Sequence, residues 1–287
     1  MNIAIIGAGR MGTTQARLAR YFGDTLAFGV ECDAAARKAF VDRFQVNTYD
    51  SVNQVPAALW KGLSLVWIVV CDGQIQTVAQ RLAPFIAANT VVLHTSGALS
   101  SQILKDALPN HPCASLHPLM ACPLPTVSDL ECVNAYRNVV HSVEGDPEAV
   151  ALARSIIERV EGRCVSIRSD KKVLYHAAAV FASNYPVTLL HICSSLLQHC
   201  GMDAEASADA ARRLMAQAAD SAQKTDFASA LTGPAKRRDM NTIASHQNAL
   251  AEFPDLLALY NGLLAQTLDL LDARDKGGAT SQASAEK

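Results

Sequence analysis

The stretch Met1-Asn2-Ile3-Ala4-Ile5-Ile6-Gly7-Ala8-Gly9-Arg10-Met11-Gly12 decides the fold. Its apolar run, Ile3 to Ile6, is typical of a strand buried on both faces. A Gly-x-Gly-x-x-Gly pattern follows at once, and a helical segment continues through Phe22. A strand, this glycine pattern and a helix, in that order, are the context in which a backbone loop binds the pyrophosphate of a dinucleotide. We therefore predict a dinucleotide site at residues 7–12.

Each glycine of this loop has its own expected task. Gly7 permits the tight turn, Gly9 lets the backbone approach the pyrophosphate, and Gly12 lets helix and strand pack closely. The N-terminus of the helix adds free N–H groups and a partial positive charge. The predicted pyrophosphate-binding residues are Gly7, Ala8, Gly9, Arg10, Met11 and Gly12.

A carboxylate follows the second apolar run, at the position of the ribose-binding residue in dinucleotide-binding folds. The run Thr25 to Val30 ends in Glu31, 19 residues past Gly12. A carboxylate at this position binds the ribose hydroxyls of the adenosine. Glu31 would also repel the 2′-phosphate of NADP, as would Asp33. The expected cofactor is therefore NAD(P), with NAD favoured, although Arg37 lies close enough in sequence to reach a phosphate.

Bulk composition indicates a globular protein that binds neither nucleic acid nor a membrane surface. The chain has 287 residues, half of them hydrophobic, and a net charge of −2, so it carries no excess of basic residues. Its eight cysteines are scattered without a Cys-x-x-Cys pair, which is typical of reduced thiols. We expect no signal peptide and no stretch near the ~18 apolar residues of a membrane span. The predicted location is the cytoplasm.

Strand and helix patterns alternate up to residue 168, which predicts a doubly wound α/β domain. The expected strands are 3–6, 25–30, one near 46, 64–70, 90–94, 113–116, 138–143 and 163–167. Residues 169–274 are predicted to form an all-helical C-terminal domain, in which Pro186 interrupts the first helix. Its expected helices are 169–183, 187–199, 204–224, 240–251 and 255–273. The polar residues 275–287 are predicted to be disordered.

Several chemically useful side chains follow predicted strands, where ligands gather in doubly wound sheets. Cys71, Asp72 and Ser96 are expected to line the cofactor. His117 is the candidate proton relay, since its ordinary pKa near 6.5 suits proton transfer at neutral pH; the alternative is a loop histidine bonded to backbone. Cys113, His117 and Cys122 lack a fourth ligand and any familiar zinc spacing, so no metal is expected.

The helical half offers candidates for orienting a substrate. Asn184 lies beside the Pro186 disruption, and we favour a functional role for it, whereas His176 is interpreted as a buried structural residue. Gly233-Pro234 makes a rigid turn that would aim Arg237 at a carboxylate; a solvated corner is the alternative. His246 lies on the helix that follows.

In this order, the motifs resemble a known family. They are the strand with GxGxxG, His94-Thr95-Ser96-Gly97-Ala98-Leu99, Ser115-Leu116-His117-Pro118-Leu119, Ala182-Ser183-Asn184, and Leu231-Thr232-Gly233-Pro234 with Arg237, Asp239 and His246. The chain resembles Rossmann-like NAD(P)-binding oxidoreductases with a C-terminal helical domain of unknown function. These are distant relatives of ketopantoate reductase, pyrroline-5-carboxylate reductase and 6-phosphogluconate dehydrogenase.

The resemblance implies an active site between a cofactor domain and a helical domain, and a homodimer formed through the helices. It implies no substrate, and one departure matters. The lysine that some relatives carry four residues before the helix asparagine is Val180 here, so their lysine-based proton transfer does not carry over.

The expected function is hydride transfer between a nicotinamide cofactor and a small carbonyl or imine acid. His117, Asn184, Arg237, His246 and Ser96 are the candidate catalytic residues. Two alternatives stay open: a non-catalytic NAD(H)-sensing protein, and a prephenate-dehydrogenase-like enzyme, which rests on the similar His-Pro turn.

Overall fold

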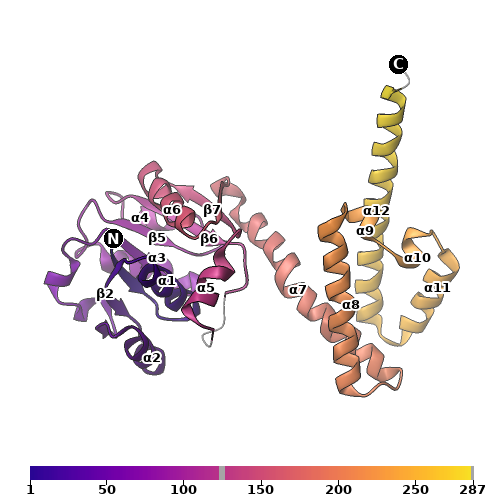
Figure 1. Cartoon of the computed structure of the whole chain (residues 1–287), viewed down its shortest axis with the longest axis horizontal. Coiled ribbons are helices and arrows are strands. Elements are labelled where there is room, and N and C mark those ends of the chain that lie inside the picture. Colours follow the sequence, from indigo (N-terminus) through magenta and orange to yellow (C-terminus); the bar gives the residue numbers. More distant parts are fainter. Residues whose placement is uncertain (123–126, 286–287) are drawn as a thin grey trace. The chain divides into compact units, whose positions relative to one another are not determined.

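An eight-stranded sheet forms the centre of the N-terminal part of the chain in the computed structural model, which describes residues 1–122 and 127–285 (Figure 1). Its strand order is β3-β2-β1-β4-β5-β6-β7-β8, and every pairing is parallel except the antiparallel pair β6–β7. The strands are β1 (Asn2–Ile6), β2 (Thr25–Val30), β3 (Thr48–Tyr49), β4 (Leu65–Ile68), β5 (Val91–His94), β6 (Cys113–Pro118), β7 (Val140–Gly145) and β8 (Arg163–Ser166). The predicted doubly wound α/β fold is confirmed.

Helices cover both faces of the sheet, because its inner strands carry apolar side chains on both faces. In β1, Ile3 and Ile5 join one buried cluster, whereas Ala4 and Ile6 join another on the opposite face. A central strand covered on both sides must be apolar throughout, as this one is. The helices are α1 (Arg10–Tyr21), α2 (Ala34–Phe44), α3 (Ile75–Leu82), α4 (Gln102–Ala107), α5 (Asp129–Tyr136) and α6 (Pro147–Arg159), and the short 3-10 turns are η1 (Val52–Gln54), η2 (Ala57–Trp60), η3 (Asp72–Gln74) and η4 (Ser169–Lys171).

Two of these helices, α4 and α5, were not predicted. Helix α4 has only six residues, too few for a clear helical period. Helix α5 carries a signal that could have been found: Ser128 and Glu131 form a capping box at its start.

Pro186 does not interrupt the first C-terminal helix, contrary to expectation. Helix α7 runs without a break from Lys172 to His199 and contains Pro186. A proline removes one hydrogen bond from a helix but does not prevent the flanking turns from continuing. The chain divides into compact units at this proline, Met1–Tyr185 and Pro186–Lys287, so the first half of α7 belongs to the N-terminal unit. Residue 168, where the boundary was expected, lies just before η4 and inside the N-terminal unit.

The C-terminal unit is helical, as predicted. Besides the second half of α7 it contains α8 (Ala204–Lys224), α9 (Phe227–Ala230), α10 (Gly233–Lys236), α11 (Met240–Ala249), the 3-10 turn η5 (Leu250–Glu252) and α12 (Pro254–Ala285). The residues from 275 to 285, expected to be disordered, continue α12.

One helical segment, Ser169–His199, has the length and apolar composition of a membrane span, with a mean hydropathy of 1.2. The expectation that no segment comes near this length therefore needs correction. Such a single helix is weak evidence for a membrane, because helices of soluble proteins reach the same hydropathy. Polar residues interrupt its apolar run, among them His176, Asn184 and His191.

Candidate functional site

The glycine loop between β1 and α1 has the geometry of a phosphate cradle. Gly7 has a φ of 102°, and a Cβ there would lie 2.6 Å from the Val69 carbonyl oxygen. At Gly12 a Cβ would lie 1.8 Å from the Gly7 carbonyl oxygen. Gly9 differs, since a Cβ there would meet no heavy atom within 4 Å. Two glycines are thus required by the fold, and the third leaves open space in front of the backbone.

The first turn of α1 leaves its N–H groups available to a ligand. Gly9 caps the helix without a side-chain hydrogen bond, and the opening N–H groups of a helix have no partner within it. The side chains of the two loop residues that follow point elsewhere: Arg10 donates to the Cys122 carbonyl over 2.6 Å, and the Met11 sulfur contacts Tyr136. Arg10 and Met11 would therefore act through their backbones.

A cavity of about 350 Å³ extends from this loop to the ends of β2 and β4. Gly7, Gly9, Glu31 and Cys71 line it, so four predicted cofactor residues meet at one cavity. The Glu31 carboxylate accepts hydrogen bonds from the N–H groups of Ala8, at 2.7 Å, and Asp33, at 2.9 Å. These bonds hold the Glu31 carboxylate at the end of β2, the position from which a carboxylate binds ribose hydroxyls in Rossmann folds.

The Arg37 guanidinium is already engaged by backbone. It donates to the carbonyl oxygens of Glu31, at 2.7 Å, and Cys32, at 3.2 Å. A 2′-phosphate would have to compete with these carbonyls and with the adjacent Glu31 carboxylate.

Ser96 builds the loop that follows β5. Its hydroxyl donates to the Asp72 carboxylate over 2.9 Å and accepts from the N–H groups of Ala98 and Leu99. The hydroxyl is therefore fully used within the protein, and it fixes Asp72 at the end of the neighbouring strand. The contact of Ser96 with a substrate remains a prediction.

His117 ends β6 within a cluster of aromatic side chains. Its Nδ1 lies 2.9 Å from the Tyr175 hydroxyl, and its ring centroid is 6.0 Å from that of His176. Gly97 makes room for both histidines, because a Cβ there would lie 2.6 Å from His176 Cδ2 and 2.9 Å from His117 Nε2. His176, interpreted from the sequence as structural, therefore stands next to the candidate proton relay.

Burial keeps the His117 ring neutral. Loss of water contact, followed by the positive charge of Lys172, lowers the pKa of His117 to about 4. At neutral pH the ring therefore has one nitrogen free to accept a proton. When Nδ1 donates its hydrogen bond to the Tyr175 oxygen, Nε2 is the nitrogen that can accept a proton.

Lys172 is a residue of this site that sequence reasoning missed. It is only 1% exposed, and its Nζ donates to the Ser96 carbonyl over 2.9 Å and to the Ser115 hydroxyl. Burial lowers the pKa of Lys172 to about 8, and the carboxylates of Glu144 and Asp72 limit the fall. In the sequence, Lys171-Lys172 resembles an ordinary solvated helix start; its burial follows from contacts with β5 and β6 that only the tertiary structure reveals.

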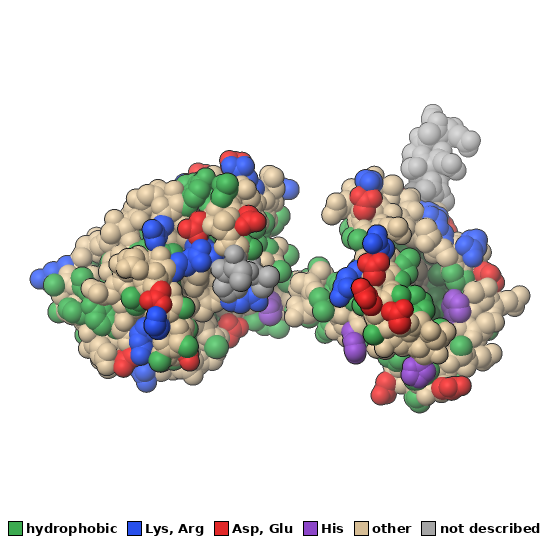
Figure 2. Space-filling view, turned by 60° about the horizontal axis from the view of Figure 1, so that its bottom comes forward, with side chains coloured by type: hydrophobic (Ala, Val, Ile, Leu, Met, Phe, Trp, Pro, Cys, Tyr) green, Lys and Arg blue, Asp and Glu red, His purple; other side chains and the backbone are tan. Residues whose placement is uncertain are grey.

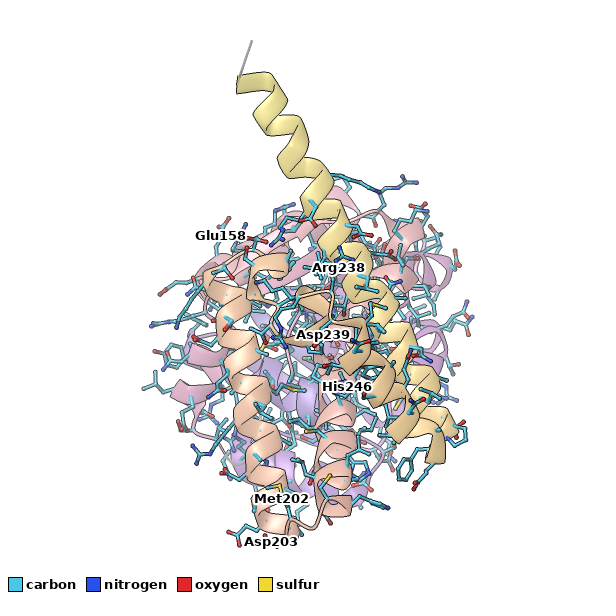
Figure 3. All side chains as sticks on the ribbon, turned by 90° about the vertical axis from the view of Figure 1, so that its right-hand side faces the viewer. Glu158, Met202, Asp203, Arg238, Asp239 and His246 are labelled. Carbon is cyan, nitrogen blue, oxygen red and sulfur yellow. The ribbon has the colours of Figure 1, made fainter. Side chains whose placement is uncertain are left out.

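The remaining candidates lie on exposed helical surface. Asn184, on α7, accepts a hydrogen bond from the adjacent Ser183 hydroxyl over 2.8 Å. In the C-terminal unit, Asp239 caps α11, and His246 bonds Tyr260 on α12. Figure 3 shows Asp239 and His246 along α11, with Arg238 beside α12, where it pairs with Asp272.

Arg237 differs from the arginine beside it. Its side chain is exposed, and among the described residues no hydrogen bond or salt bridge engages its guanidinium. The structure thus leaves Arg237, rather than Arg238, available to an anion.

All eight cysteines are free thiols. Within residues 1–122 and 127–285, no group of three or more potential metal ligands comes together.

This sheet order with its glycine loop is that of the Rossmann dinucleotide-binding fold. Residues 139–267 match the family DUF2520, a domain of unknown function. This match covers less than half of the chain and names no activity, whereas the Rossmann-type fold that the sequence motifs imply is confirmed by the sheet order. A search of curated proteins finds no match.

Solved structures share the architecture over nearly the whole chain. Protein TM1727 from Thermotoga maritima is 24% identical, with a TM-score of 0.73, and the match covers 95% of this chain and 99% of that one. A protein described as an NADP oxidoreductase from Bacteroides fragilis is 20% identical, with a TM-score of 0.72 and coverages of 93% and 98%. Prephenate dehydrogenase from A. aeolicus, in complex with hydroxyphenyl propionate and NAD+, is 15% identical, with a TM-score of 0.58 and coverages of 96% and 98%. At these identities the likeness establishes the fold.

Proposed function

We propose that this protein is an NAD(P)-dependent oxidoreductase that transfers a hydride between the nicotinamide cofactor and a small carbonyl or imine acid. The observation that carries the proposal is the contrast within the glycine loop. Gly7 and Gly12 are sterically obligatory, yet Gly9 faces open space beside a 350 Å³ cavity. A loop that only turned the chain would not need an open glycine at the helix N-terminus.

The residues present fit the cofactor. The backbone at Gly9, Arg10 and Met11 would hold the pyrophosphate, and Glu31 the adenosine ribose. Cys71 and Asp72 would border the cofactor at the end of β4. When bound, the nicotinamide group supplies or accepts the hydride.

Glu31 is proposed to make NAD the preferred cofactor. Wild-type protein is expected to bind NADH at least about tenfold more tightly than NADPH, because a fixed carboxylate attracts ribose hydroxyls and repels a 2′-phosphate. In Glu31→Gln this ratio should fall about tenfold, whereas Glu158→Gln, on α6, should not change it. Calorimetry with both cofactors measures the ratio, and a wild-type preference for NADPH would refute the assignment.

His117 is proposed to move the proton that accompanies the hydride. During oxidation of an alcohol its neutral ring accepts the hydroxyl proton, and during carbonyl reduction the same nitrogen returns it. Tyr175 fixes the ring through Nδ1, and Gly97 keeps the space beside Nε2 free of a side chain. Ser96 would contribute by holding Asp72 in place.

Asn184, Arg237 and His246 are proposed to orient the substrate. The free guanidinium of Arg237 supports binding of a carboxylate, for which a planar pair of donors is well suited. Arg237→Leu should raise KM for an acid substrate about tenfold or more, while Arg238→Leu should not; equal KM values in wild type and Arg237→Leu would remove Arg237 from this role.

We further propose that the protein is a soluble, cytoplasmic homodimer joined through its helices. Helix α7 exposes Val173, Phe181 and Val187, each more than 60% accessible, and hydrophobic side chains gather in the middle of the visible face of the C-terminal unit (Figure 2). Apolar surface of this kind marks interaction sites. Light scattering should give twice the 30.6 kDa chain mass, and Phe181→Glu should lower it; a monomeric wild type would contradict the proposal.

Turnover separates the enzyme from the alternative of a non-catalytic NAD(H) sensor. Oxidation of NADH with a panel of 2-oxo acids and cyclic imines is expected for at least one compound. Binding of NADH with no turnover on any of them would favour the sensor.

A further inference from the structure

We propose that Lys172 is a positioning residue of this site: its buried ammonium group fixes the ends of β5 and β6 against α7 and disfavours a second positive charge on His117. The inference rests on the proposed function only for its consequence, the supply of a neutral His117. The contacts of Lys172 and their effect on His117 lie within this chain and require no ligand.

The contacts of Lys172 join three elements of the site. The ammonium donates to the Ser96 carbonyl after β5 and to the Ser115 hydroxyl in β6, and Ser115 in turn donates to the Ser96 carbonyl over 3.3 Å. Lys172 begins α7, the helix that carries Tyr175 and His176 against His117. A lysine at this position therefore sets where α7 starts relative to the two strand ends that carry the candidate site.

A buried counter-charge keeps the lysine protonated. Glu144 lies 3.9 Å from Lys172 Nζ, and both side chains are at most 5% exposed. The Glu144 carboxylate also accepts hydrogen bonds from the Ser101 backbone N–H and from the hydroxyls of Ser101 and Ser169. A buried ion pair of this kind is held by its hydrogen bonds, and here it keeps a positive charge near the buried histidines.

The neighbouring histidines are arranged as neutral rings. His94 accepts from the Ser96 N–H through Nδ1 over 3.1 Å, and its Nε2 lies 3.3 Å from the Ser100 carbonyl, which it can reach only as a donor. These two bonds match the neutral imidazole. Burial and the Lys172 charge lower the pKa of His94 to about 3, as the same two causes lower that of His117. The groups that face His117 or Lys172 are His94 from β5, His141 and Glu144 from β7, Asp72 from η3, and Tyr175 and His176 from α7.

The test is the titration of His117 in full-length protein with isotope-labelled histidine, followed by NMR of the imidazole carbons. The His117 signal is assigned by its absence from His117→Gln. In wild type it should show no titration near pH 6.5. In Lys172→Met the pKa of His117 should rise by about one pH unit or more toward 6.5, because a nearby like charge has been removed. The His94 signal should move in the same direction.

A matched lysine provides the control. Lys105 is paired with Asp146. Burial, and to a smaller extent the charge of Lys105, lower the pKa of His111. Lys105→Met should therefore raise the pKa of His111 and leave that of His117 unchanged. Lys172→Met leaves Glu144 buried without its partner, so the double variant Lys172→Met/Glu144→Gln, which removes both charges, is measured as well and should give the same rise at His117.

Two results would overturn the inference. One is a wild-type His117 that titrates near pH 6.5, and the other is an unchanged His117 pKa in the double variant. Neither depends on cofactor or substrate, so NADH binding can succeed while this inference fails, and the reverse.

Discussion

Replacing His117 by alanine is expected to lower kcat/KM about 10²–10⁴-fold, the usual contribution of a general acid–base group, while the Kd for NADH stays nearly unchanged. The two quantities separate because His117 ends β6, whereas the cofactor loop lies between β1 and α1. Removing the imidazole takes away the proton acceptor without touching the residues that would hold the dinucleotide.

The comparison uses whichever substrate the panel identifies with wild-type protein. His191→Ala, an exposed histidine further along α7, serves as the control and should keep full activity. In the direction of alcohol oxidation, wild-type kcat/KM should fall only as the pH approaches 4, since the neutral ring is the reactive form and the pKa of His117 is about 4. Full activity of His117→Ala would remove His117 from its assigned role.

Gly12→Ala is expected to damage the fold itself. Its Cβ would lie 1.8 Å from the Gly7 carbonyl oxygen and 3.1 Å from a Val69 methyl group, and neither the carbonyl nor the strand behind it can yield without moving β1 away from α1. Overpacking of this kind costs about 1–3 kcal/mol or more. Urea denaturation should therefore show a lower free energy of unfolding, together with loss of NADH binding.

Gly9→Ala provides the contrast, because its Cβ enters open space and the backbone there is extended, with φ −64° and ψ −168°. The stability of Gly9→Ala should match that of wild type. Equal stability of wild type and Gly12→Ala would show that the loop is looser than its geometry indicates.

The sequence predicts the geometry of the glycine loop better than the surroundings of His117. Gly7, Gly9, Gly12 and Glu31 lie within one β-α-β unit, so local spacing alone specifies how they meet. His117 could be proposed because it follows a strand. The surroundings of His117 come from residues far away in the chain: Lys172, Tyr175 and His176 approach through the start of α7, and no local pattern reports that contact.

Elsewhere, the errors have identifiable causes. The predicted break at Pro186 does not form, because the long apolar segment around this proline remains helical. For His176, which lies among alanines, the sequence indicates a structural role but not its neighbour: its ring centroid lies 6.0 Å from that of His117. Asn184, which belongs to the same stretch, lies on exposed surface, and its functional role stays a prediction.

The most direct test of the central claim, that the loop at residues 7–12 binds a nicotinamide dinucleotide, is a calorimetric titration of NADH into wild-type, Gly9→Ala and Gly262→Ala protein. Gly262 is equally open and lies on α12, which makes it the matched glycine. Wild type and Gly262→Ala should bind NADH alike, and Gly9→Ala should bind at least about tenfold more weakly, equivalent to about 1.4 kcal/mol, with an unchanged Tm. Failure of wild-type protein to bind either NADH or NADPH, or equal affinity in Gly9→Ala, would contradict the account.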